Sequence, residues 1–153
     1  MNSGIRCLII DDEEAICATL AYHFKDSHIE PVITSSAFDA LKIIEDQIID
    51  AVITDLQMKE MNGLELLKRI KDKNPDLPVV IITGYGSIEL AVEALKNGAF
   101  DFISKPVRIE QLLTVVNNAI EKYKLKLENA LLKHQFANKI KTGQDFIGNS
   151  EQI

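Results

Sequence analysis

Five short apolar segments alternate along the chain with amphipathic segments of helical length. The strand candidates are residues 5–10, 29–34, 51–54, 79–83 and 100–104; helical patterns lie near 14–26, 37–47, 63–73 and 87–97, and a last one starts near Arg108. Regular alternation of this kind predicts a parallel sheet with helices on both faces. We therefore expect a flavodoxin-like, doubly wound α/β fold with strand order 2-1-3-4-5.

The strand candidates differ in how apolar they are, and this difference indicates their place in the sheet. The runs CLII, AVI and VVII are continuously apolar, as strands covered on both faces are. The second candidate reads IEPVIT and contains Pro31. A proline removes one hydrogen-bond donor from a strand, so this segment is expected at an edge.

The last helical pattern is unusually long, because no glycine or proline interrupts residues 108–141. This is about three times the mean length of a globular helix. Its first half can cover a sheet, and one seven-residue register then reads Leu113, Val116, Ile120, Tyr123, Leu127, Ala130, His134 and Ala137. Such a pattern favours pairing with another helix, although a solvated linker helix remains an alternative. Thr142-Gly143 is expected to end the helix.

Charge and composition limit the possible partners. Residues 1–120 hold 11 Lys/Arg against 19 Asp/Glu, which argues against direct nucleic-acid binding by this part. No apolar run approaches the roughly 20 residues that cross a membrane, and the N-terminus lacks signal-peptide features. We expect a cytoplasmic protein without a membrane partner. Cys7 and Cys17 are interpreted as buried small side chains.

Three carboxylates follow two strands that the predicted order places side by side. Asp11 and Asp12 come directly after the first strand, and Asp55 comes after the third. Their repulsion would raise at least one pKa unless a cation were present. Because a small site with oxygen ligands favours Mg²⁺, the sequence predicts a magnesium site at the carboxyl edge of the sheet.

Two further polar residues end neighbouring strands, Thr83 and Lys105. A hydroxyl and an ammonium beside a metal-bound carboxylate are the groups that phosphoryl transfer requires. Asp55 would be the nucleophile, while Lys105 and the metal neutralise phosphoryl oxygens. Taken singly, each residue has an ordinary structural interpretation, as a helix cap, a turn residue or an exposed lysine.

Five separated motifs together resemble the receiver domain of two-component response regulators, over residues 5 to about 122. They are LIIDDEE at 8–14, TDLQM at 54–58, MNG at 61–63, ITG at 82–84 and SKP at 104–106. The resemblance implies that a sensor histidine kinase phosphorylates Asp55. It further implies that Asp12 binds Mg²⁺ directly, Asp11 partly through water, and Gln57 through its carbonyl.

The resemblance also implies a conformational switch. Lys105 would pair first with Asp55 and then with its phosphoryl group, Thr83 would swing toward the phosphoryl, and Phe102 would be the switch aromatic, although plain core is an equal interpretation of Phe102. The Lys105–Pro106 bond is cis in the family. The surface of the fourth helix, fifth strand and fifth helix would then repack and, together with the linker helix, carry homodimer contacts. Receivers usually have a proline where Lys59 stands, and Gln57 and Tyr85 occupy positions that tune dephosphorylation.

The tail segment DFIGNS at 145–150 resembles the start of the AAA+ ATPase domain in sigma-54-dependent transcriptional activators of the nitrogen-regulation type. The expected organisation is a receiver over 1–122, a helical linker over 123–142 that can form a coiled coil, and the beginning of a truncated ATPase domain over 143–153. The receiver would then control transcription through the ATPase, without turning over a separate substrate.

Three other interpretations were weighed. A dimerisation scaffold that is not phosphorylated would have no use for the Asp/Thr/Lys set. A magnesium-dependent aspartyl phosphohydrolase usually carries two aspartates separated by one residue after its first strand, whereas Asp11 and Asp12 are adjacent. A flavin-binding protein would need a phosphate-cradling turn where residues 11–14 are acidic.

Overall fold

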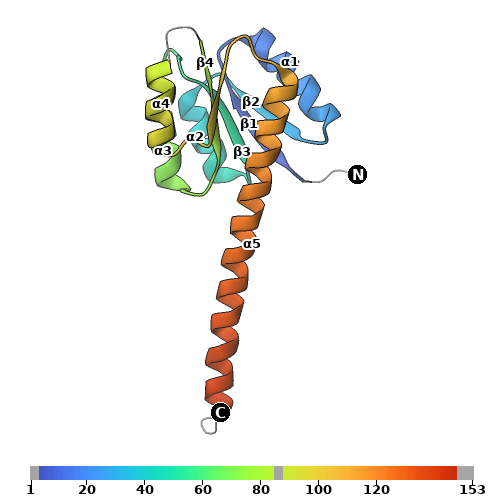
Figure 1. Ribbon diagram of the computed structural model, residues 1–153, viewed down its shortest axis with the longest axis vertical. Helices are drawn as coiled ribbons and strands as arrows, with labels where there is room; N and C mark the ends of the chain where they lie inside the picture. Colours follow the sequence, from blue (N-terminus) through green and yellow to red (C-terminus); the bar gives the residue numbers. More distant parts are fainter. Residues whose placement is uncertain (1–3, 85–87, 148–153) are drawn as a thin grey trace. The chain divides into compact units, whose positions relative to one another are not determined.

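The computed structural model describes residues 4–84 and 88–147, with side chains as far as residue 137. Within these residues, strands and helices alternate (Figure 1). The strands are β1 Arg6–Ile10, β2 Glu30–Thr34, β3 Ala51–Asp55, β4 Val79–Thr83 and β5 Asp101–Ser104, and the helices are α1 Glu14–Asp26, α2 Ala37–Asp46, α3 Gly63–Lys73, α4 Ile88–Lys96 and α5 Ile109–Ile147. The elements lie close to their predicted positions.

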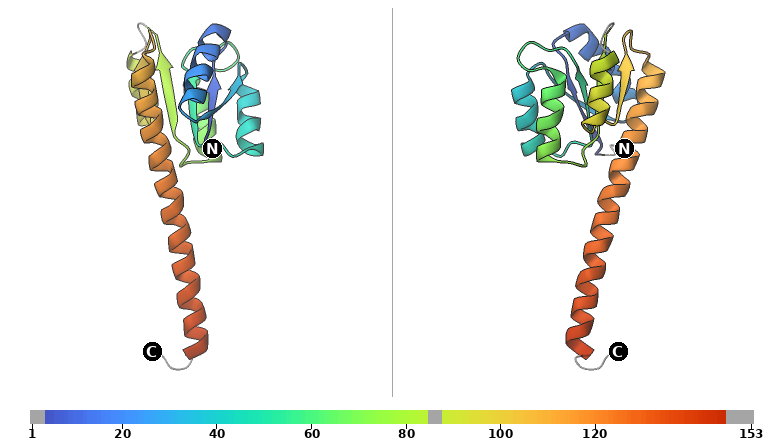
Figure 2. Two further views of the ribbon diagram at one scale, coloured as in Figure 1. Left: turned by 90° about the vertical axis from the view of Figure 1, so that its right-hand side faces the viewer. Right: turned by 60° about the vertical axis from the view of Figure 1, so that its left-hand side comes forward.

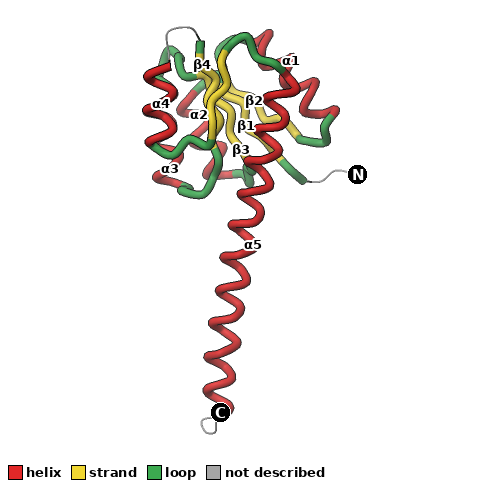
Figure 3. The backbone as a smooth tube through the Cα atoms, viewed as in Figure 1, coloured by secondary structure: helices red, strands yellow, loops and turns green. Residues whose placement is uncertain are grey.

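The strands form one sheet in the order β2-β1-β3-β4-β5, and every neighbouring pair is parallel (Figure 3). This confirms the predicted doubly wound α/β fold. β3 and β4 are buried along their whole length, as their continuous apolar sequences predicted. β2, which contains Pro31, lies at the edge and is partly exposed.

Two apolar cores cover the two faces of the sheet, because successive residues of a strand point to opposite sides. Leu8 and Ile10 of β1 pack with α2 and α3, whereas Cys7 and Ile9 pack with α1 and the first part of α5. Figure 1 and Figure 2 show α1 and the first part of α5 on one side of the sheet and α2 and α3 on the other. Both faces are therefore closed, and the polar strand ends remain at the carboxyl edge.

The helix α5 runs from Ile109 to Ile147, so the prediction that it ends at Thr142-Gly143 is wrong. A glycine inside a helix costs only about 1 kcal/mol relative to alanine, and it stops a helix only when it also adopts a capping conformation. Contacts divide the chain into two units, 1–123 and 124–153. Among the described residues, no helix combines the length and the apolar character needed to span a membrane.

Candidate functional site

The predicted site residues come from the carboxyl ends of four strands. Asp55 and Thr83 are the last residues of β3 and β4, Asp11 follows β1, and Lys105 follows β5. Because β1 pairs with β3 and β4 pairs with both β3 and β5, the strand order brings these residues to one edge of the sheet. This edge is where doubly wound folds bind their ligands.

Asp55 is nearly buried and both of its carboxylate oxygens are hydrogen-bonded. The residue is 5% exposed. Its Oδ1 accepts the backbone N–H of Gln57 at 3.1 Å, and its Oδ2 accepts the Lys105 ammonium at 2.8 Å. The Lys105 pair therefore compensates a buried negative charge that would otherwise be costly.

Asp11 is the second buried carboxylate, at 3% exposed. Its Oδ1 accepts the Glu13 N–H at 2.9 Å, whereas Oδ2 is the one buried side-chain oxygen or nitrogen without a hydrogen-bond partner in the described part of the chain. Burial raises the pKa of Asp11; the Glu13 N–H opposes this shift and the charge of Asp55 adds to it. Such an oxygen has room for a hydrogen-bond donor or a cation.

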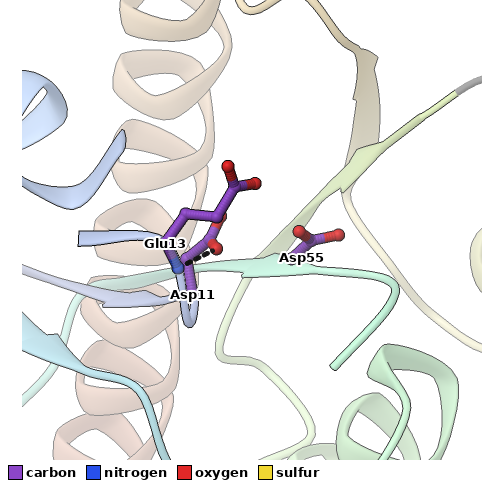
Figure 4. A group of neighbouring side chains, drawn as sticks. All are labelled: Asp11, Glu13 and Asp55. Carbon is purple, nitrogen blue, oxygen red and sulfur yellow. Dashed lines mark hydrogen bonds between the residues drawn. The ribbon is translucent and has the colours of Figure 1, made fainter. Parts of the chain in front are cut away.

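One carboxylate oxygen each from Asp11, Glu13 and Asp55 lies within 4.8 Å of the other two (Figure 4). All three are hard oxygen donors, which suit Mg²⁺ or Ca²⁺ rather than softer metals. The unpartnered Asp11 Oδ2 and this donor set together fit a divalent cation. Asp12, which the sequence singled out, is exposed and is not one of these three residues, and Gln57 is also exposed.

Lys105 contacts two carboxylates at once. Its ammonium lies 2.8 Å from Asp55 Oδ2 and 3.5 Å from Glu13 Oε1. Burial alone would lower the pKa of Lys105, but the hydrogen bond to Asp55 and the charges of Asp55, Asp11 and Glu13 raise it. Lys105 is therefore a permanent positive charge at this edge. Its peptide bond to Pro106 is cis, the isomer that the resemblance implied.

Thr83 ends β4, and Phe102 lies within β5. Thr83 is fully buried, and its hydroxyl donates to the Gly84 carbonyl at 3.4 Å. Its own carbonyl accepts the Lys105 N–H at 2.7 Å, which ties the ends of β4 and β5 together. Phe102 is half-buried and packs against the core that contains α2 and α3. Tyr85 lies outside the described residues.

A cavity of about 640 Å³ adjoins the carboxylates on the side of β2 and α2. Asp11, Asp12, Met58, Lys59 and Glu60 are among the residues that line it. Lys59, which stands where receivers usually have proline, is exposed on this wall. The exposed carboxylate of Asp12 thus shares a cavity with a lysine.

Residues 7–117 match the response regulator receiver domain family. The chain belongs to this family. The receiver is 42% identical over 139 residues to a putative NtrX-like response regulator of Rickettsia typhi, an alignment that covers 90% of this chain and 29% of the relative.

Solved structures of other receivers share the fold. NtrX of Brucella abortus, solved in complex with ADP, is 39% identical with a TM-score of 0.78, over 83% of this chain and 29% of that one. The beryllofluoride-activated NtrC4 receiver dimer is 33% identical with a TM-score of 0.74, over 77% of this chain and 98% of that one. The chain thus spans less than a third of the NtrX proteins that it matches.

Sequence reasoning about this receiver missed Glu13. The sequence does place Glu13 next to the two aspartates, but a third acidic residue at a helix start is usually interpreted as a partner of the helix dipole. Only the structure shows its carboxylate beside Lys105. Of the predicted set, Asp55 and Thr83 end strands, and Asp11 and Lys105 directly follow strands, all at the same edge.

Proposed function

We propose that this receiver accepts a phosphoryl group on Asp55 from the phosphohistidine of a sensor histidine kinase. The observation that carries the proposal is the 2.8 Å contact between Lys105 and the nearly buried Asp55. A carboxylate held between an ammonium and a backbone N–H has a fixed orientation, and the ammonium lies where transferred oxygens would need charge compensation.

The chemistry is an in-line displacement at phosphorus. An oxygen of Asp55 forms the new O–P bond as the N–P bond to the histidine breaks, and the bonding electron pair stays on the imidazole nitrogen. Lys105 then pairs with a phosphoryl oxygen, and the Thr83 hydroxyl turns from the Gly84 carbonyl to another. A Mg²⁺ bound by Asp11, Asp12, Asp55 and the Gln57 carbonyl would neutralise charge on the same oxygens.

The output surface is proposed to be the α4–β5–α5 face. α4 exposes four large apolar side chains, Ile88, Leu90, Val92 and Leu95. Exposed apolar side chains that gather on one helix are typical of a protein interaction surface. Movement of Thr83 would free space for Phe102 and repack this face. A second copy of the chain is the proposed partner, and the beryllofluoride-activated NtrC4 receiver is itself a dimer.

The second unit, residues 124–153, also has features that favour a second copy of the chain as the partner. Between residues 124 and 137 its helix exposes Leu125, Leu127, Leu131, Leu132 and Phe136. The predicted heptad register fits this surface only in part. Val116, Ile120 and Tyr123 of the register are buried in the first unit, and of the exposed apolar residues only Leu127 belongs to it. An isolated helix with such an apolar surface gains stability by packing against another helix.

Control of a sigma-54-dependent ATPase and of transcription follows as the proposed role of the whole protein. The support is the DFIGNS segment, of which Gly148 to Ser150 lie outside the described residues, and the much greater length of the NtrX relatives. The Brucella NtrX was solved with ADP, which is consistent with a nucleotide-binding domain beyond the receiver.

The phosphoacceptor is tested by incubating the chain with acetyl phosphate and Mg²⁺ and mapping the modification by mass spectrometry. Wild type should gain one phosphoryl group on Asp55, and Asp55→Asn should gain none. Asp72→Asn, a change to an exposed carboxylate on α3, is the matched control and should be phosphorylated normally. Labelling of Asp55→Asn at the same rate as wild type would refute the proposal.

The dimer is tested by sedimentation of the whole chain and of a variant that lacks residues 124–153. We expect a dimer that this deletion weakens, because it removes the exposed leucines of the second unit. Each is measured with and without beryllofluoride plus Mg²⁺, which gives the direction of the switch. A monomer in all four samples would contradict the proposed partner.

A further inference from the structure

The Glu13 side chain is placed where local helix stability does not require it. Glu13 is the N-cap residue of α1, yet its carboxylate makes no capping hydrogen bond. The equivalent residues of α2 and α3, Ser36 and Asn62, both cap their helices through the side chain. Glutamate is also not among the preferred N-cap residues. The Glu13 carboxylate extends instead to the Lys105 ammonium.

The charges at this edge do not balance without a further cation. Asp11, Glu13 and Asp55 bring three carboxylates, whose nearest oxygens lie within 4.8 Å of one another. Lys105 brings one ammonium, in contact with Asp55 and Glu13. Independently, Asp11 Oδ2 is buried and has no hydrogen-bond partner. The neighbouring carboxylate of Asp12 adds to this excess of negative charge, which a divalent cation would offset.

The spacing of the oxygens suits a small divalent cation. Mg²⁺ binds oxygens at about 2.0–2.1 Å, so opposite ligands of one ion lie about 4.2 Å apart. The three oxygens are at most 4.8 Å apart, and Glu13 has a long side chain that is 57% exposed and can adjust. Asp12 is also exposed and lines the cavity that Lys59 lines.

We propose that Glu13 is a further carboxylate of the divalent-cation site, beside Asp11, Asp12 and Asp55. This inference rests on the proposed cation-dependent function of the site and adds a residue to it. Glu13 acts as a positioning residue: it attracts the cation and gives Lys105 a second partner. The Glu13 carboxylate is partly in water, so its charge is screened. Its effect on Mg²⁺ affinity should therefore lie between that of a buried ligand and that of a surface residue.

The test is calorimetric titration of the chelator-treated chain with Mg²⁺ alone, for wild type, Glu13→Gln, Glu14→Gln and Asp11→Asn. Glu14 is the matched control, because it is the adjacent exposed glutamate and is not one of the three clustered carboxylates. We expect Glu13→Gln to weaken Mg²⁺ binding about tenfold at low ionic strength. Glu14→Gln should change it less than twofold, and Asp11→Asn should weaken it more than Glu13→Gln does.

Thermal unfolding without Mg²⁺ separates this role from a structural one. Glu13→Gln removes repulsion among carboxylates and no capping bond, and the long, partly exposed ion pair with Lys105 that it also removes contributes little. Its melting temperature in chelator should therefore equal or exceed that of wild type, whereas a mainly structural role would lower it. Equal Mg²⁺ affinities for Glu13→Gln and Glu14→Gln, with normal phosphorylation of Asp55, would overturn the inference alone. A wild-type chain that binds no Mg²⁺ would overturn the proposed function with it.

Discussion

Replacing Gly63 by alanine should distort the loop that joins the phosphoacceptor strand to α3. Gly63 is buried, is the first residue of α3, and donates its N–H to the Leu56 carbonyl at 2.7 Å. A Cβ at this position would lie 2.7 Å from the Asp55 carbonyl oxygen and 2.7 Å from Leu56 Cα. Both are backbone atoms, so no side chain can rotate away to make room.

The cost follows from the displacement that the new carbon requires. Non-bonded carbon atoms pack best at about 3.5–4.0 Å, so the backbone at Asp55 or Gly63 must move by roughly 1 Å. Overpacking of this size costs about 1–3 kcal/mol. Because alanine recovers part of this through its helix propensity, we expect Gly63→Ala to lower the free energy of unfolding by about 2 kcal/mol. The displaced Asp55 backbone should also slow phosphorylation.

The measurement is urea unfolding followed by far-ultraviolet circular dichroism at fixed protein concentration. Gly84→Ala is the matched control, because a Cβ at Gly84 would have no atom of the described, non-adjacent residues within 4 Å. Its unfolding free energy should change by less than about 0.5 kcal/mol. If Gly63→Ala were as stable as wild type, the close approach of α3 to the end of β3 would be wrong.

Three smaller predictions concern other groups. Burial raises the pKa of Asp11, so the folded chain holds a proton that the unfolded chain has lost. In chelator, the free energy of unfolding measured in urea should therefore fall as pH rises from about 4 toward neutrality. Asp11→Asn should reduce this fall and be more stable than wild type at pH 7. Burial raises the pKa of Cys17 to about 11, so iodoacetamide at pH 8 should modify Cys17 about 100-fold more slowly in the native chain than in urea, as measured by mass spectrometry. The Tyr123 hydroxyl accepts the Asn74 side-chain amide at 3.0 Å, and Tyr123→Phe should cost about 1 kcal/mol in urea unfolding.

The fold could be predicted because buried strands and surface helices have different patterns of apolar residues along the sequence. β3 and β4 are apolar without interruption and are buried on both faces, whereas Pro31 marks the edge strand β2. The same logic located most of the site, because parallel strands end at one edge. Asp55 and Lys105, fifty positions apart in the chain, form a hydrogen bond for that reason.

The direction of the side chains and the length of α5 were harder to predict from the sequence. Nothing in the order Asp11, Asp12, Glu13 tells which carboxylates turn toward Asp55, because that depends on how the chain enters α1. The backbone N–H of Glu13 bonds to Asp11, and this turn places the Glu13 carboxylate beside Lys105 while Asp12 is left exposed. The end of α5 was equally ambiguous, since Gly143 can be either a stop or a tolerated interior residue.

The backbone of the site is held too firmly to carry a signal by sliding. β3, β4 and β5 are joined in fixed register, with Thr83 opposite Ser104, and the Lys105 N–H bonds to the Thr83 carbonyl. A one-residue shift would turn every side chain to the other face. In the proposed switch, side chains would move first: the Thr83 hydroxyl, which has only a long 3.4 Å bond to leave, and half-buried Phe102. We accordingly expect Thr83→Ala to preserve phosphorylation of Asp55 but to abolish any beryllofluoride-dependent change in sedimentation. A mutant that still switched would show that the signal takes another path.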